Sequence, residues 1–354
     1  MPSEPSVAAP IPEPPPSRKR PRRLFLYLPF ILLALLAAGY GGFWFVVTSK
    51  VERAVDARAE ALRQAGYVVE LDGRRVEGFP FRIKIRQTEA RIASPSGWAV
   101  SAPGLEAEAY LHDPGHWVLV APQGLVVNRP EGGGLTVKGE ALRGSVAGTD
   151  KAPWRIVLQG RKLTVAPAAG ARPFSLASAD LLELYLRPTP DGKEGMALIR
   201  LEGGKAGDGS VLEAVAGDEA VTGSLQARLS RPAAFRGADW GDAVRAWAAA
   251  GGAAEEVQGS LIAGKSEAKV ENGTLGVGAD GRLVGALPMT LKQPAPAITA
   301  LAGGAALDEG AVNSAAAVAA ARAQGETARI NLVFQAGATT LGPVRIGPSP
   351  RVVK

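Results

Sequence analysis

The chain has no cysteine and only two histidines among its 354 residues. Without cysteine it has no disulfides, no thiolate metal ligands and no cysteine nucleophile, and a chain of this length can build a large core without crosslinks. The histidines, His112 and His116, flank Asp113 in the segment LHDPGHW. Residues four apart share a face only on a helix, and Pro114 with Gly115 predicts a turn between strands instead. We therefore expect no metal site.

Signatures of catalysis are equally scarce. No G-x-S-x-G elbow and no H-E-x-x-H pair occurs, and the glycine runs at 132–134 and 203–204 match neither of the common phosphate-binding patterns. Any serine nucleophile would have to recruit His112 or His116 as its base. We expect no cofactor and no enzymatic activity, with a hydrolase of envelope polymers as an alternative that rests on these two histidines.

The chain also lacks a dense face of either charge. Its formal net charge is +6, and the first 23 residues, with five basic and two acidic side chains, supply half of it. The remaining +3 is spread over 331 residues, which is too dilute to neutralise a run of phosphates. We therefore do not expect a nucleic acid as partner.

Charge is entirely absent between Leu24 and Val47. These 24 residues form about 36 Å of helix, enough to cross a hydrocarbon layer of about 30 Å. A cleaved signal peptide is the main alternative, but its apolar core is usually only about 7 to 15 residues long and ends at a small-residue cleavage site, which is not evident here. The segment predicts a transmembrane helix over residues 24–47.

Basic residues crowd the amino-terminal side of this segment: Arg18, Lys19, Arg20, Arg22 and Arg23. Because the more positive flank stays in the cytoplasm, residues 1–23 are predicted to be a disordered, proline-rich cytoplasmic tail, and the rest of the chain is predicted to be periplasmic. Trp44, near the other end, suits the far headgroup layer. These features predict a single-pass protein of the inner (cytoplasmic) membrane.

The apolar periodicity changes twice after the membrane segment. Residues 48–66 repeat apolar side chains at helical spacing and end at a glycine, which predicts an amphipathic stalk helix. From residue 67 to 354 the dominant period is two, as in FRIKIR, where Phe81, Ile83 and Ile85 alternate with basic residues. This basic strand face is interpreted as solvated, although lipid phosphates would also fit it.

Short apolar segments separated by turn sequences such as SPSG, PQG and EGGG predict an antiparallel, curled, mainly β domain. The early strand candidates are Trp98–Ser101, Leu105–Leu111, Trp117–Ala121, Leu135–Leu142, Trp154–Leu158 and Lys162–Ala166. Covering helices are predicted at Asp239–Ala250 and Glu309–Gln324. A division into two sub-domains, if there is one, is expected near residues 230–258.

Three segments carry a resemblance to a known family: VEGFPFRI at 76–83, SGWAVSAPGLEAEAYLHDPGHWVLVAP, and ARINLVFQAGATTLGPVRIGPSP near the end. From about Leu24 onward the chain resembles the uncharacterised bacterial envelope family called domain of unknown function 2125, and more loosely AsmA-like envelope proteins. The nearer resemblance implies a periplasmic β-rich fold after an amino-terminal anchor. The looser one implies a groove that shields acyl chains.

The motif shared with the nearer family is Gly78, Phe79, Pro80 and Phe81. Its physical interpretation is a turn in which glycine frees the backbone and proline fixes φ. The two phenylalanines are expected to anchor the first strand in the core.

Three functions follow from these expectations. The first is a non-enzymatic factor that binds lipid or supports envelope assembly. The second is a structural or protein-interaction module tethered to the inner membrane, with another envelope protein as partner. The third is the hydrolase described above.

Overall fold

The structure, a computed structural model, describes residues 24–149, 153–237, 240–294, 314, 318–319 and 323–353. The chain divides into two compact units, one ending at Val46 and the other running from Val47 to Lys354. The proline-rich tail lies outside the described residues, as do the basic residues that predict the topology: Arg18, Lys19, Arg20, Arg22 and Arg23.

The helix α1 (Leu24–Gln64) runs without interruption across the boundary between the two units. Within the described residues, its segment from Tyr27 to Gln64 is the one helix long and apolar enough to cross a membrane. None of the residues in its most apolar stretch is buried. A helix that is apolar all round and unburied is typical of a membrane span, which agrees with the uncharged sequence between Leu24 and Val47.

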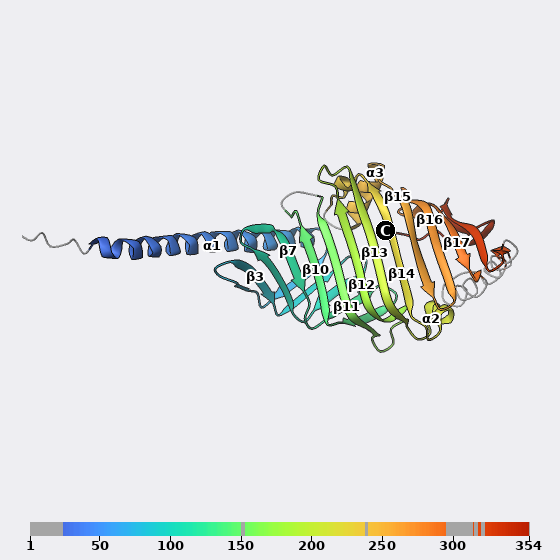
Figure 1. Cartoon of the computed structure of the whole chain (residues 1–354), viewed down its shortest axis with the longest axis horizontal. Helices are drawn as coiled ribbons and strands as arrows, with labels where there is room; N and C mark the ends of the chain where they lie inside the picture. Colours follow the sequence, from blue (N-terminus) through green and yellow to red (C-terminus); the bar gives the residue numbers. More distant parts are fainter. Residues whose placement is uncertain are drawn as a thin grey trace, which may run out of the picture. The chain divides into compact units, whose positions relative to one another are not determined.

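The second unit is built on antiparallel β-strands, and every strand pair in the described residues is antiparallel (Figure 1). The larger group of strands, here called the main sheet, contains in spatial order β2 (Arg75–Glu77), β3 (Arg82–Gln87), β6 (Leu105–Tyr110), β7 (Asp113–Val120), β10 (Ala141–Ala147), β11 (Arg155–Pro167), β12 (Leu176–Pro188), β13 (Glu194–Ala206), β14 (Val221–Ser230), β15 (Ala254–Ala263), β16 (Ser266–Val277), β17 (Leu283–Lys292), β19 (Thr327–Gln335) with β18 (Ala323–Gln324) beside it, β20 (Ala338–Leu341) and β21 (Val344–Pro348). The predicted antiparallel, mainly β fold is confirmed.

A smaller group, the short sheet, forms a second layer, and its cyan strands lie behind β7, β10 and β11 in Figure 1. Its strands, in spatial order, are β1 (Val68–Asp72), β4 (Glu89–Ala93), β5 (Ala99–Ala102), β8 (Leu125–Arg129) and β9 (Gly133–Lys138). Up to β10 the chain alternates between the layers, and from β10 to β17 each strand pairs with the next.

Both sheets join at the long strand β11. Its first half pairs with β10 of the main sheet, and its last residues, from Thr164 to Pro167, pair with β9 of the short sheet. Lys162, between the two halves, has a φ of +48°. An unpaired residue in the left-handed region bends a strand and increases its twist, so this position allows the two layers to diverge.

The predicted apolar side chains of β3 are buried. Ile83 and Ile85 are buried on one face of this strand, and Val69, Ala90 and Ala102 are buried on one face of the short sheet. The alternation predicted from FRIKIR is therefore confirmed within the strand.

The basic side chains of β3 point to the outer face and are paired with acids on β6. Lys84 Nζ lies 2.6 Å from Glu106 Oε2, and Arg82 Nη1 lies 2.7 Å from Glu108 Oε1. The hydrogen bond from Lys84 lowers the pKa of Glu106 below its usual range, and the charge of Arg86 contributes further. Because β6 supplies these partners, the outer face of β3 is a ladder of cross-strand ion pairs.

Two strand predictions and one turn prediction are wrong in detail. The predicted strand Leu135–Leu142 is two strands, because the chain crosses from β9 to β10 at Gly139, where a Cβ would lie 2.7 Å from the carbonyl oxygen of Arg161. The two strands expected within β11 are one, since the irregularity at Lys162 bends the strand without ending it. A turn is expected at Pro114 and Gly115, but the turn lies before these residues, and β7 already begins at Asp113. Pro114 is tolerated there because a proline near the start of a strand does not need to donate a hydrogen bond.

Two helices cover the ends of the main sheet. α2 (Val211–Ala216) begins at Ser210, whose hydroxyl accepts a hydrogen bond from the N–H of Glu213, and packs Ala216 against Val221 and Ala263. The helix predicted at Asp239–Ala250 is confirmed as α3 (Trp240–Ala249). The short 3-10 turn η1 (Pro232–Ala234) precedes α3.

On α3, Val244 and Trp247 are buried, and the indole N–H of Trp247 donates to the carbonyl of Ser230 at 2.7 Å. Trp240, which helical spacing places on the same face, lies at the first residue of the helix and is exposed. Its ring stacks on Phe235 at 6.2 Å between ring centroids. The second predicted helix, Glu309–Gln324, lies mostly outside the described residues, and its last two residues form β18.

Candidate functional site

One face of the main sheet is apolar across many consecutive strands. Residues directly opposite each other in an antiparallel sheet point to the same side. Following the register from strand to strand gives a single apolar row: Leu119, Gly144, Leu158, Leu184, Ile199, Leu225, Gly259, Val270, Met289 and Ile330. The apolar interior between the two layers therefore continues along the main sheet beyond the short sheet.

In the described part of the chain, no element covers part of this face. Six large aliphatic side chains on five neighbouring strands, β11 to β15, are exposed on it: Leu158, Leu182, Leu184, Ile199, Leu225 and Leu261. We call these six residues the open apolar face. Scattered exposed leucines are common on proteins, whereas a contiguous exposed apolar patch marks a binding surface.

Both ends of the strands are covered beside this patch. Near α2, the buried cluster of Ala216, Val221 and Ala263 packs against Leu201, which lies on the same face as Ile199. Near α3, Trp247 closes the other end. The open apolar face is thus a strip that runs across the strands, between two capped ends.

The strip continues towards the short sheet around β11. A Cβ on Gly160 would lie 2.6 Å from a methyl group of Leu163, so the leucine side chain occupies the space that the glycine leaves on the apolar side. On the inner face of the short sheet, the paired residues Ile92 and Val100 are also exposed. Apolar surface therefore lines both layers.

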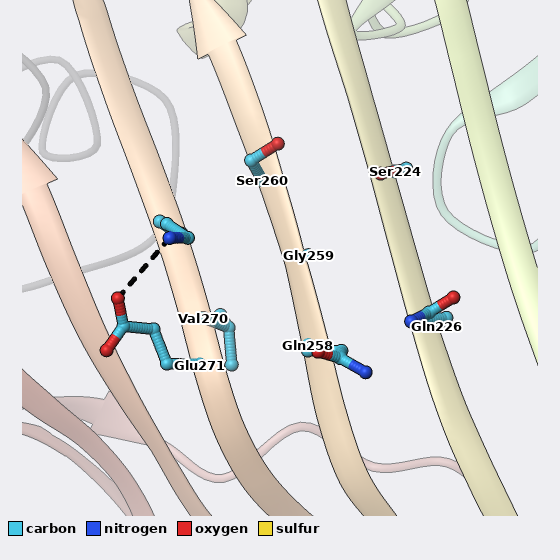
Figure 2. A pocket seen from close by; sticks show the side chains of 8 residues that line it. Ser224, Gln226, Gln258, Gly259, Ser260, Val270 and Glu271 are labelled. Carbon is cyan, nitrogen blue, oxygen red and sulfur yellow. Dashed lines mark ion pairs between the residues drawn. The ribbon is translucent and has the colours of Figure 1, made fainter.

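The opposite face of the main sheet is polar. Gln159 and Tyr185 donate hydrogen bonds to the buried carboxylate of Glu183 at 2.9 and 3.0 Å. The hydrogen bond that Tyr185 donates raises the pKa of its own hydroxyl. An open hollow of about 530 Å³ lies on this face. Figure 2 shows side chains that line it, such as Ser224 and Gln258. Its charged groups are already paired or solvated, so it has the character of an ordinary wet strand surface.

A more apolar hollow of about 850 Å³ lies at the β4–β5 turn, between the short sheet, the start of α3 and the carboxyl end of the chain. Trp98 and Trp240 line it together with Tyr67 and Arg351. Its lining shows that the short sheet approaches elements more than a hundred residues away in the sequence. The hollow therefore lies where the β4–β5 turn, α3 and the carboxyl end of the chain come together.

The histidines predicted to be structural are on the surface. Tyr110 and His112 have ring centroids 5.2 Å apart. His116 Nε2 lies 3.0 Å from Ser145 Oγ, and its Nδ1 lies 3.8 Å from Asp113 Oδ2. The order serine, histidine, aspartate is that of a hydrolytic triad, but the second distance exceeds a hydrogen bond, and both His116 and Asp113 are about half exposed on the outer face of β7.

The Gly78–Phe81 motif forms the turn between β2 and β3. Gly78 has a φ of +107°, which an L side chain adopts only with strain, and its carbonyl accepts a hydrogen bond from the N–H of Arg82 at 2.9 Å. The expectation that both phenylalanines are anchored in the core is wrong, since Phe79 is 58% and Phe81 is 69% exposed. The strand starts at Arg82, so its inward alternation does not extend back to Phe81.

Comparison of the sequence with models of protein families gives a match over almost the whole of the chain described above. The model of a family described as "uncharacterized protein conserved in bacteria (DUF2125)" matches residues 44–350. The chain belongs to this family. The DUF2125 match includes the stalk part of α1, both sheets and the turn at Gly78, which agrees with the resemblance seen in the sequence. Neither a curated protein nor a solved structure matches the chain, and the looser likeness to AsmA-like proteins stays a prediction.

The open apolar face is the feature that sequence reasoning missed. A signal for it exists in the segment LLELYL, where Leu182, Leu184 and Leu186 alternate with other residues on β12. Such alternation shows which side chains share a face. It does not show whether another element covers them.

Proposed function

We propose that this DUF2125 chain is a non-enzymatic lipid-binding protein of the bacterial envelope, anchored in the inner membrane by α1, which holds acyl chains on the open apolar face of its periplasmic β domain. The observation that carries the proposal is the set of six exposed aliphatic side chains in register on five adjacent strands.

The size of the strip favours an acyl chain. Neighbouring strands lie about 4.8 Å apart, so the four intervals from β11 to β15 cover about 19 Å. One leaflet of a bilayer is about 15 Å of hydrocarbon. An extended acyl chain therefore fits along the strip.

The chemistry of the strip favours lipid over a protein partner. Its side chains are leucines and one isoleucine, whereas energetic centres of protein interfaces are enriched in tryptophan, tyrosine and arginine. The same chain also carries a helix suited to a membrane. A membrane helix in the same chain would keep a lipid-binding surface close to lipid, so no other protein is needed to bring it there.

A photocrosslinking amino acid tests this proposal in the intact protein. With p-benzoylphenylalanine in place of Leu225, ultraviolet irradiation of membranes should give lipid adducts detectable by mass spectrometry. The matched control carries the crosslinker at Met196, which is exposed on the polar face of β13, and should give few. Discrete protein adducts at Leu225 would favour the tethered interaction module, and no adduct of either kind would refute both.

The proposal of a non-enzymatic role has its own test at Ser145. Water reaches His116 and Asp113 freely, and the long Nδ1–Oδ2 separation of 3.8 Å does not hold the imidazole in the orientation that a general base needs. We expect a fluorophosphonate probe to leave Ser145 unlabelled at pH 7 to 8. Labelling that disappears in Ser145→Ala and in His116→Ala would restore the hydrolase.

A further inference from the structure

Exposed aromatic side chains gather at one end of the main sheet, around the β2–β3 turn. Phe79 and Phe81 lie on this turn, and the carbonyl of Phe81 accepts a hydrogen bond from the N–H of Leu111 at 3.0 Å, which brings the end of β6 beside it. Tyr110, also exposed, is the last residue of β6. We call Phe79, Phe81 and Tyr110 the aromatic end.

Basic charge accompanies these rings. The guanidinium of Arg82 lies 5.2 Å from the centroid of the Tyr110 ring and also pairs with Glu108. Aromatic rings beside arginine are the composition that proteins place at the boundary between headgroups and hydrocarbon, where a ring can have one side in each. On a surface that never meets lipid, the ring of Phe81 would stay 69% exposed to water.

The second unit also fixes the height of this turn along the stalk part of α1. After the stalk the chain returns antiparallel to it: Arg63 donates to the carbonyl of Val69 at 2.9 Å, and Arg74 pairs with Asp56 at 2.7 Å. The extended chain from Arg74 to the turn covers about 13 Å in four residues. The helix from Asp56 back to Val47 covers about 14 Å in nine. Because these two lengths match, the aromatic end is expected level with the start of the stalk.

The start of the stalk is also where the uncharged stretch of the sequence ends. Val47 is its last residue, and Lys50 and Arg53 follow. If α1 spans the bilayer, Val47 is at the surface where the helix leaves it, with lysine and arginine in the headgroup layer. A turn at the same level meets the same layer.

We propose that Phe79 and Phe81 insert into the periplasmic headgroup and upper acyl layer of the membrane that α1 crosses, so that the β domain is docked on the bilayer and not only tethered to it. This inference rests on the membrane anchoring of the proposed function, but it does not depend on lipid binding at the open apolar face. It gives a role to the shared Gly78–Phe81 motif, which the fold does not bury. Glycine at Gly78 provides the turn, and the two rings provide the insertion.

The absence of native cysteine makes a direct test possible in the full chain. Single variants Phe79→Cys and Phe81→Cys, each spin-labelled and reconstituted in nanodiscs of phosphatidylethanolamine and phosphatidylglycerol, report the depth of the turn by electron paramagnetic resonance. We expect collisions with the water-soluble nickel reagent to be several-fold rarer, and collisions with oxygen more frequent, than for a label at Asp218→Cys on the exposed turn after α2. Labels at 79 and 81 that match the Asp218 label overturn the proposal.

A label at Leu33→Cys separates the two possible failures. A buried label at Leu33 together with wet labels on the turn means that the anchor holds and the docking is wrong. A wet label at Leu33 means that the anchor itself is wrong, and docking is overturned with it. Contact of the turn with a protein partner would appear as labels shielded from both reagents, which also overturns insertion into lipid.

Discussion

Replacing Leu225 and Leu261 together by aspartate should remove most acyl-chain binding from the open apolar face. The experiment uses the full chain in nanodiscs that contain a phospholipid with a diazirine in its acyl chain, and mass spectrometry of the labelled peptides. Burying even a neutralised polar group in hydrocarbon costs about 2 kcal/mol or more, and about 1.4 kcal/mol is a tenfold change in binding. We therefore expect labelling of β12 to β15 to fall about tenfold or more.

A matched variant exists because β15 carries two aliphatic neighbours on opposite faces. Leu261, on the open apolar face, is 43% exposed, and Ile262, on the polar face, is 42% exposed. The double variant Met196→Asp/Ile262→Asp adds the same charges on the polar face and should leave the labelling unchanged. Labelling of α1 within the membrane is an internal standard for reconstitution. Equal loss in both double variants, or in neither, would contradict the assignment of the site.

Truncation of Ile83 should have the largest effect on stability. Its side chain is 0% exposed, and β3 is held by pairing with β2 on one side and β6 on the other, so the strand cannot move to close a cavity. Removing three carbons from such a site lowers the free energy of unfolding by about 2 to 5 kcal/mol. Urea unfolding of the detergent-solubilised chain, followed by tryptophan fluorescence, measures this loss for Ile83→Ala.

The same substitution at Ile92 is the control. Ile92 lies on β4 of the short sheet and is 41% exposed, so Ile92→Ala removes the same atoms from a side chain that has less surface to lose. We expect a loss of about 1 kcal/mol or less. Similar losses for both variants would mean that Ile83 does not lie in a close-packed core.

Membrane docking and acyl-chain binding are assigned to different parts of the same domain. In the proposed docking, the aromatic end brings one edge of the main sheet to the membrane surface, whereas the open apolar face lies on strands farther along the same sheet. The apolar row from Leu119 to Ile330 crosses the open apolar face and starts on β7, so it does not include the aromatic end. Failure of the Phe79 and Phe81 labels to insert would leave the acyl-chain site intact, and the Leu225 experiments decide that site independently.

Much of the fold was predictable from local patterns. The uncharged run from Leu24 to Val47 predicts α1, and the alternation around Ile83 predicts which side of β3 faces inward. These predictions hold because helix length and strand periodicity are set by residues next to each other in the sequence. The absence of cysteine and the scarcity of histidine likewise limit the chemistry that any fold of this chain can support.

Strand boundaries at the junction of the sheets were not predictable in the same way. The crossing at Gly139 depends on the carbonyl of Arg161, and the continuity of β11 depends on partners from both sheets that hold it on either side of Lys162. The sequence shows the glycine and the apolar residues, but it does not show which distant residues they contact.

The sequence by itself determined that this is a mainly β chain with one apolar helix, and which residues of each strand share a face. Only the tertiary structure decided that the face with Leu184 and Ile199 is left open, that Phe79 and Phe81 are outside the core, and that His116 meets Ser145. The physical reason is that periodicity is a property of neighbours along the chain. Exposure depends on whether a segment distant in the sequence covers the face, and such segments come together only in the folded chain.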